Sequence, residues 1–174
     1  MSGAGTLSDA STVIYLAKAD ALEEAHALLG ALLIPPAVWG EVVGTGKSGE
    51  QLDQARIRSA LDRGVLGLVE LEPLEASRAI VIGGRHRIGL GESQLLAIAR
   101  KGSLVLMDER RGARIARRFG VVPIRTMSIP LVGVRRGLIT RPAALSLLRR
   151  LAVVTGVRAE LFMRLEDEIR EARR

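Results

Sequence analysis

The chain has 174 residues, of which 48% are hydrophobic and 26% charged, a composition typical of one folded domain and not of a disordered or fibrous protein. It contains no cysteine, which excludes disulfides, thiolate metal sites and cysteine nucleophiles. The start MSGAGTLSDAS lacks the features of a signal peptide, and no apolar run approaches the roughly 18 residues of a membrane span, so we expect a soluble, cytoplasmic protein with no membrane partner.

Apolar runs alternate with helical patterns along the chain. Strands are predicted at 6–8, 32–34, 65–71, 104–107 and 121–124. Helices are predicted from Ser11 or Thr12, over 21–29, from Pro35–Pro36 to Val43, over 50–63, 76–82, 92–100 and 110–119, and through most of the chain after Ser128, with breaks near 137–142 and 156. Strands separated by helices favour right-handed crossovers and a mostly parallel sheet. We therefore predict an α/β domain with a helical C-terminal extension.

Two glycine-rich segments interrupt this pattern. The sequence Gly44-Thr45-Gly46-Lys47-Ser48 is similar to the end of a phosphate-binding loop, but position 41 is Glu where that motif needs Gly, and a helix precedes it instead of a strand. We interpret 44–49 as a flexible break. The segment 83–91 is predicted to be a basic loop that either clamps a substrate or is an ordinary exposed loop.

Four acidic residues lie where an apolar run gives way to a helical pattern: Asp9, Glu41, Glu92 and Asp108. A parallel sheet gathers such positions at the carboxyl edge of its strands, where ligands bind. Clustered carboxylates repel one another unless a divalent cation neutralises them. The alternative is that Asp9, Glu92 and Asp108 only cap helices or interact with their dipoles. Glu41 is predicted to lie among apolar neighbours within a helix, which capping does not explain.

Charge is distributed unevenly. Residues 100–150 carry thirteen basic residues against two acidic ones, a local balance of +11 in a chain of net charge +7. Such a block is typical of a surface that binds a polyanion, although arginines scattered over solvated faces are the alternative. Aromatic residues make up only 2% of the chain, so we expect nucleic acid to be held mainly by its phosphates. Within this block the helix 110–119 repeats arginine at helical spacing, and the candidate RNA-binding residues are Arg110, Arg111, Arg114 and Arg117.

Four ordered blocks resemble those of the PIN-domain ribonuclease superfamily, which contains the VapC-type toxins. The blocks read SDASTVIYLA, IPPAVWGEV, GLGESQLLAIA and LVLMDERRGARIA, the last followed by VVPI, and they cover most of residues 6–140. The first block is most similar to that of a poorly characterised subgroup. The resemblance implies a three-layer α/β/α Rossmann-like fold with a central, mostly parallel sheet of about five strands. It divides the chain into a nuclease core, 1–140, and a helical extension, 141–174.

The resemblance also implies a function and a set of site residues. The function is that of a Mg²⁺- or Mn²⁺-dependent endoribonuclease, the toxin of a VapBC-type pair, which forms a homodimer and binds a small antitoxin. Asp9, Glu92 and Asp108 would be the metal ligands, and Glu41 would hold a metal-bound water or act as a base. Ser11 and Glu109 would support them. Glu92 and Glu109 stand where many members have Asp, and Glu is an oxygen ligand too.

Two alternatives remain open at this point. The acids may serve only as caps in a catalytically inactive PIN-like protein that binds RNA or acts as a scaffold. The apolar faces of the C-terminal helices, around Leu148 and Leu165, either pack on the sheet or provide a homodimer or antitoxin contact.

Overall fold

A five-stranded parallel sheet forms the centre of the molecule in a computed structural model that describes residues 5–44 and 51–172. The strands are β1 (Thr6–Ser8), β2 (Leu32–Ile34), β3 (Leu66–Leu68), β4 (Leu104–Leu106) and β5 (Val122–Ile124). Their order is β3-β2-β1-β4-β5, and every neighbouring pair is parallel. From β1 the sheet is extended to one side by β2 and β3 and to the other side by β4 and β5. The topological switch point therefore lies between β1 and β4, which is where open α/β sheets bind ligands.

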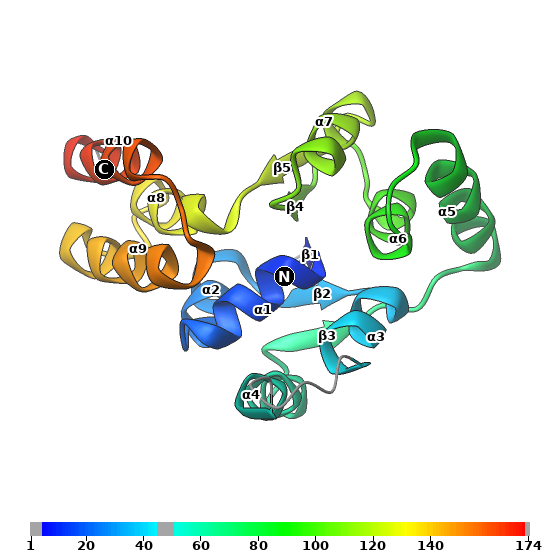
Figure 1. Ribbon diagram of the computed structural model, residues 1–174, viewed down its shortest axis with the longest axis horizontal. Helices are drawn as coiled ribbons and strands as arrows, with labels where there is room; N and C mark the ends of the chain where they lie inside the picture. The colour runs from blue at the N-terminus through cyan, green and yellow to red at the C-terminus, as the bar shows by residue number, and fades with distance from the viewer. Residues whose placement is uncertain (1–4, 45–50, 173–174) are drawn as a thin grey trace.

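Helices surround this sheet (Figure 1). The described residues form α1 (Ala10–Lys18), α2 (Leu22–Leu29), α3 (Pro36–Gly44), α4 (Gln51–Asp62), α5 (Pro73–His86), α6 (Leu90–Ile98), α7 (Arg110–Arg118), α8 (Ile129–Arg135), α9 (Arg141–Thr155) and α10 (Ala159–Glu171), with a 3₁₀ turn at Thr126–Ser128. Apolar residues of the inner strands are almost fully buried, among them Leu32, Ile34 and Leu106, whereas Leu68 and Val122 of the edge strands are 49% and 47% exposed. The predicted α/β class and the sheet of about five parallel strands are confirmed.

One predicted loop is wrong. Residues 83–86 belong to α5, which runs without a break to His86 and ends at Arg87 in the left-handed conformation, φ 51°. A Cβ at Gly83 would lie 3.4 Å from the Ser93 hydroxyl oxygen, so Gly83 permits the close packing of α5 on α6. The ring of His86 packs edge-on to Phe119, with centroids 5.9 Å apart. The predicted strand 65–71 is also shorter, at Leu66–Leu68, and the predicted break at 44–49 lies outside the described residues except for Gly44, which ends α3.

The C-terminal helices use their apolar faces within this chain. Leu147, Leu148, Leu151, Leu165 and Ile169 are each no more than 4% exposed, so of the two alternatives left open by the sequence, packing within the chain applies to these five residues. Charged contacts fix α10 to its neighbours: Arg135 of α8 donates to Glu168 at 3.0 Å, and Arg149 of α9 lies 3.4 Å from Glu166.

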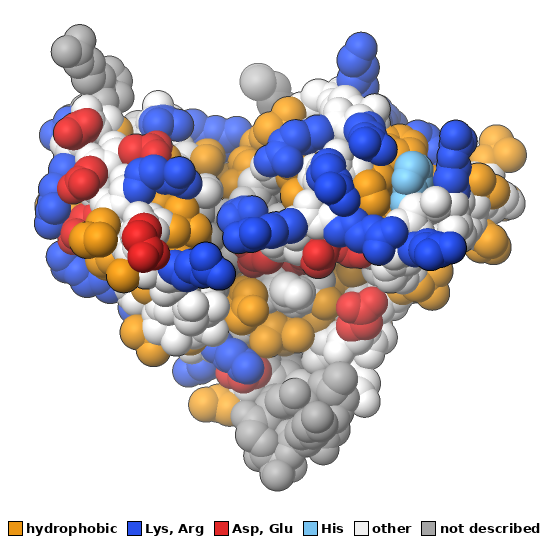
Figure 2. Space-filling model, turned by 45° about the horizontal axis from the view of Figure 1, so that its top comes forward, with side chains coloured by type: hydrophobic (Ala, Val, Ile, Leu, Met, Phe, Trp, Pro, Cys, Tyr) orange, Lys and Arg blue, Asp and Glu red, His pale blue; other side chains and the backbone are white. Residues whose placement is uncertain are grey.

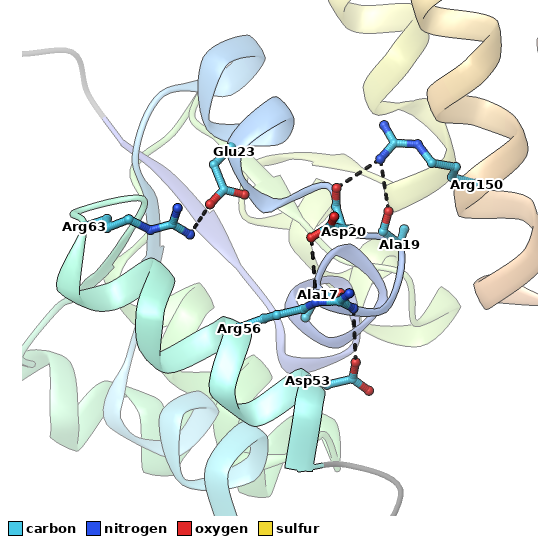
Figure 3. Close-up of polar contacts among 8 residues, drawn as sticks. All are labelled: Ala17, Ala19, Asp20, Glu23, Asp53, Arg56, Arg63 and Arg150. Atoms are coloured by element: carbon cyan, nitrogen blue, oxygen red, sulfur yellow. Dashed lines mark hydrogen bonds and ion pairs between the residues drawn. The ribbon is translucent and has the colours of Figure 1, made fainter.

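Two arginines attach α4 and α9 to the turn between α1 and α2 (Figure 3). Arg56 donates to the Ala17 carbonyl at 3.0 Å and lies 3.7 Å from the Asp20 carboxylate. Arg150 donates to the carbonyls of Ala19 and Asp20 at 3.1 and 3.0 Å. Because Asp20 adopts the left-handed conformation, φ 51°, these bonds hold a turn that few residues form readily. They also place α9 and α10 next to the helix that follows β1.

In the described part of the chain, no helix is long and apolar enough to cross a membrane.

Candidate metal and nucleic-acid site

Asp9 and Asp108 lie side by side at the carboxyl ends of β1 and β4. Asp9 is buried, at 5% exposure, and caps α1 because its Oδ1 accepts a hydrogen bond from the Thr12 amide at 2.8 Å. Its other oxygen, Oδ2, accepts from the Asp108 amide at 3.1 Å. This second bond links two segments that are 99 residues apart in the sequence. It holds the Asp9 carboxylate next to Asp108 at the switch point between β1 and β4.

Thr126, which follows β5, holds Asp108 in place. Its amide donates to Asp108 Oδ1 at 3.0 Å, and its hydroxyl also contacts Asp108 Oδ2. The same hydroxyl lies 3.1 Å from that of Thr12, so both aspartates belong to one buried polar network. Thr126 is fully buried. The sequence did not single it out, because a threonine after a short strand has no distinguishing pattern, and only its pairing with Asp108 reveals it.

Glu92 reaches the same region from the first turn of α6. Its Oε2 accepts from the Gly89 amide at 3.2 Å, whereas Oε1 is buried and lacks a hydrogen-bond partner among the described residues. Gly112 of α7 allows this approach, because a Cβ there would clash with Glu92 Oε1 and would lie 2.7 Å from Met107 Sδ. The absence of a side chain at position 112 therefore brings α7 against α6.

Glu41 approaches from α3, on the other side of α6. Its side chain is exposed, so the prediction that it lies among apolar neighbours is wrong; Val38 and Val42 point into the core and Glu41 does not. A Cβ at Gly91 would lie 2.8 Å from Glu41 Oε1, which shows that this carboxylate lies against the start of α6. The Gln94 side chain accepts from the Ala37 amide at 2.9 Å and ties the two helices together.

The two supporting residues lie in different surroundings. Ser11 is exposed, and the hydrogen bond to Asp9 is made by Thr12. Glu109 caps α7, accepting from the Gly112 amide at 2.7 Å. Capping therefore accounts for one bond each of Asp9, Glu92 and Glu109, but not for Asp108, whose carboxylate faces Thr126. The catalytic and metal-binding roles of these residues stay predictions.

The pKa values of two of these acids are raised. Burial raises the pKa of Asp9 above its ordinary value, and the charge of Asp108 adds to this rise, while the hydrogen bonds from Thr12 and Asp108 oppose it. Burial also raises the pKa of Glu92, with further contributions from the charges of Glu109, Asp9 and Glu41. The negative charges of these acids therefore act on one another, and a bound cation would reduce their repulsion.

The carboxylates of the candidate site are suitable ligands for a hard divalent cation, but their side chains do not meet at one point. Carboxylate oxygens are the ligands that Mg²⁺ and Mn²⁺ prefer, and Glu92 Oε1 is a buried oxygen to which no described residue donates a hydrogen bond. However, across residues 5–44 and 51–172 no group of three or more Asp, Glu or His side chains is close enough to hold a metal ion in this conformation. A metal bound by Asp9, Glu92 and Asp108 together would require their side chains to rearrange from this conformation.

Arginines of α7 border the acidic residues. Arg110, Arg111, Arg114, Arg117 and Arg118 are all exposed, while Gly112, Ala113, Ile115 and Ala116 are buried. None of the ion pairs among the described residues involves an α7 arginine. Figure 2 shows Lys and Arg side chains in a row above a narrow band of acidic side chains. A polyanion on this face would reach the acids and the arginines together.

Comparison with known proteins gives one finding. The family model described as PIN domain matches residues 6–162, which include all five strands and the five acidic residues of the candidate site. No curated protein and no solved structure matches the chain. Because the matched segment covers most of the sequence and coincides with the observed α/β fold, the chain belongs to the PIN domain family.

Proposed function

We propose that this protein is a Mg²⁺- or Mn²⁺-dependent endoribonuclease that hydrolyses RNA phosphodiester bonds. PIN domains are generally nucleases and typically use divalent metals. The observation that carries the proposal is the pairing of Asp9 and Asp108 at the carboxyl ends of β1 and β4, with Asp9 Oδ2 bonded to the Asp108 amide. The pKa of Asp9 is raised. Repulsion between two carboxylates held together at this edge destabilises the folded protein unless a cation neutralises their charge.

The residues have distinct roles in this proposal. Asp9, Asp108 and Glu92 would hold the metal, which when bound polarises the phosphate and lowers the pKa of water. Thr126 and Thr12 keep Asp108 and Asp9 from turning away. Glu41, which is exposed beside α6, would accept the proton of the attacking water. The α7 arginines would bind the flanking phosphates as charge-assisted donors.

The test is cleavage of end-labelled structured RNAs in Mn²⁺ or Mg²⁺, with EDTA and an Asp9→Asn variant as controls. Asparagine is as good an N-cap as aspartate, so this variant keeps α1 capped, while it removes the charge and the oxygen that accepts from the Asp108 amide. We expect metal-dependent cleavage that disappears in both controls. Cleavage that survives Asp9→Asn at the wild-type rate would contradict the assignment of the site.

A second candidate is a catalytically inactive PIN-like protein that binds RNA or acts as a scaffold. It is favoured by the separation of the acidic side chains and by the capping bonds of Asp9, Glu92 and Glu109. Retained RNA binding, without cleavage of varied RNAs and without saturable Mn²⁺ binding, would support it over the nuclease.

The resemblance to VapC-type proteins supports a finer proposal, that the chain is the toxin of a VapBC-type pair, forms a homodimer and is masked by a small antitoxin. Induced expression in a bacterial host is expected to arrest growth, and Asp9→Asn to restore it. The mass of the purified protein, measured by light scattering, tests the homodimer. Normal growth on expression of an active nuclease would contradict the toxin role without affecting the nuclease.

A further inference from the structure

A hollow beside Asp108 contains a cation to which the proposed function gives no role. Its volume is about 160 Å³, well above the ~15 Å³ that one water molecule needs, so a phosphate group has room in it. The wall is formed by Asp108 and Arg125 together with Tyr15, Met127, Thr155, Val157 and Leu161. Arg125 is the one basic residue of this wall, and it lines the same hollow as an acid that we propose to bind the metal.

The backbone on both sides of Arg125 is bonded to the end of β4. The Met107 amide donates to the Ile124 carbonyl at 2.9 Å, and the Thr126 amide donates to Asp108 Oδ1 at 3.0 Å. Position 125 lies between these two bonds, so its backbone has a fixed place relative to the Asp108 carboxylate. A catalytic group needs a fixed place of this kind, because a group that must first reorient loses part of its effect.

The guanidinium of Arg125 has no partner in the described part of the chain. Arg125 is exposed, and its side chain takes part in none of the ion pairs among the described residues. Both oxygens of Asp108 contact Thr126 instead. A guanidinium has five N–H donors and stays charged in proteins, so it can bind a phosphate through two parallel bonds but cannot give up a proton. Its contribution to a reaction would therefore be electrostatic.

Hydrolysis adds negative charge at a place that is already acidic. In the proposed reaction, a water oxygen bonds to phosphorus and the bond from phosphorus to one sugar oxygen breaks. The water loses a proton to Glu41, and the sugar oxygen gains one from solvent. The transition state therefore carries one negative charge more than the bound RNA, spread over the oxygens around phosphorus. The carboxylates of Asp9, Glu92 and Asp108 repel this charge, whereas a fixed cation on the phosphate stabilises it.

We propose that Arg125 is a catalytic residue that donates hydrogen bonds to the phosphate under attack and stabilises the charge of the transition state. The phosphate would lie in the hollow, against the Arg125 guanidinium on one side and the acids of the candidate site on the other. This role rests on the proposed function and adds to it a group that acts on the chemical step. It differs from the role of the α7 arginines, which bind flanking phosphates equally before and during the reaction.

The experiment separates the chemical step from binding. Single-turnover cleavage of an end-labelled RNA in Mn²⁺ gives the rate constant at saturating protein, and fluorescence anisotropy in EDTA gives the Kd of the same RNA. Arg125→Ala is expected to lower the rate constant about 100-fold or more, which is the usual effect of removing one donor to a transition-state oxyanion. The Kd is expected to change less than about threefold. Arg125→Lys should recover only part of the rate, because an ammonium lacks the two-bond geometry.

Further measurements exclude a structural explanation. The Tm in EDTA, and its rise with Mn²⁺, are expected to be the same in Arg125→Ala and the wild type, because this side chain holds neither the fold nor the metal. Guanidinium chloride, far below the concentrations that unfold proteins, is expected to raise the rate of Arg125→Ala but not that of Arg125→Lys. The matched control is Arg100→Ala, which removes the same charge from an exposed position before β4, at the opposite end of this strand from Asp108. Its rate should equal that of the wild type.

Each contrary result has a distinct meaning. Cleavage by the wild type with an unchanged rate constant in Arg125→Ala would overturn the catalytic role of Arg125 and leave the nuclease standing. An equal loss in Arg100→Ala, a rise in Kd that accounts for the whole defect, or loss of the Mn²⁺ effect on Tm would do the same. Absence of cleavage by the wild type would overturn the proposed function and the role of Arg125 with it.

Discussion

Glu92 provides the sharpest single-residue prediction because its Oε1 is buried without a hydrogen-bond partner in the described part of the chain and lies near three other acids. In EDTA at neutral pH, Glu92→Gln should increase the free energy of unfolding, since it removes a charge that burial and repulsion disfavour. A gain of about 1 kcal/mol corresponds to a rise in Tm of about 2–4 °C for a chain of this size. Thermal denaturation measures it, with Glu70→Gln at an exposed position as the control. A fall in Tm would contradict the electrostatic argument.

The raised pKa values of Asp9 and Glu92 also predict how stability changes with pH. Folding raises both pKa values, so the folded protein binds protons more tightly than the unfolded chain. Their contribution to stability is therefore complete below the unfolded pKa values, near 4, and is lost as pH rises through the folded-state values. The difference in Tm between Glu92→Gln and wild type should grow from acidic to neutral pH in EDTA. A difference that is constant with pH would show that the charge of Glu92 is not responsible.

Thr126 tests whether the polar network around the aspartates matters for function. Thr126→Val keeps the shape of the side chain but removes the hydroxyl that contacts Asp108 and Thr12. Loss of a hydrogen bond to a charged group costs about 1.5–3 kcal/mol, and residues that orient metal ligands change activity or affinity about 10- to 100-fold. We expect a lower Tm and slower metal-dependent cleavage. Ser77→Ala, which removes a hydroxyl bonded only to the Pro73 carbonyl, should leave cleavage unchanged.

At the residue scale, the sequence predicted that Asp9 and Asp108 meet at the edge of the sheet but not what holds them. Asp9 and Asp108 each follow an apolar strand, and parallel strands align such positions. Thr126 contacts Asp108 across 18 residues and Thr12 across 114, and no local pattern records a bond of that kind. Glu41 was misplaced because its apolar neighbours in sequence lie on a different face of the helix from its own side chain.

Helix packing at the site depends on Gly112, and this dependence can be tested against a second glycine. Alanine favours a helix interior over glycine by about 1 kcal/mol, but at position 112 its Cβ would clash with Glu92 and with Met107 Sδ. Gly112→Ala should therefore displace α7, lower the Tm and reduce cleavage. Gly84→Ala is the matched control, because a Cβ at this exposed glycine of α5 would have no atom within 4 Å, so the substitution should gain stability. If both substitutions stabilised the protein equally, α7 would not be held against Glu92 as described.

At the element scale, a proline marks a helix start well, as at Pro36, whereas α1 begins at Ala10 with Asp9 as its cap, ahead of the predicted Ser11 or Thr12. The error at 83–84 has a packing cause. Adjacent glycines usually break a helix, but Gly83 lies against Ser93, where the contact between α5 and α6 favours a small residue. Tertiary packing therefore overrides a local preference, and sequence alone could not indicate the partner helix.

At the scale of the whole molecule, the alternation of strands and helices was sufficient to predict the parallel sheet, whereas the hollow that Arg110 of α7 lines together with Arg158 and Arg164 was not predictable. In that hollow α7 lies opposite α10, which packs on α9 and α8, and Arg150 attaches α9 to the turn after α1. The positive charge of residues 100–150 is thus joined by Arg158 and Arg164 from a segment whose own charge is balanced. The division into 1–140 and 141–174 stays a prediction.

Metal binding is a property of the whole fold, because its ligands come from elements that only the folded sheet brings together. An ion that binds the folded state alone raises stability by RT ln(1 + [L]/Kd), about 2.7 kcal/mol at one hundred times Kd, which corresponds to a rise in Tm of about 5–10 °C. We expect Mn²⁺ to raise the Tm of the wild type at pH 7.5 and to do so less at pH 5, where protons compete for Asp9 and Glu92. Asp108→Asn should remove most of the Mn²⁺ effect while leaving the Tm in EDTA the same or higher. An equal Mn²⁺ shift in that variant would place the ion elsewhere and would favour the scaffold over the nuclease.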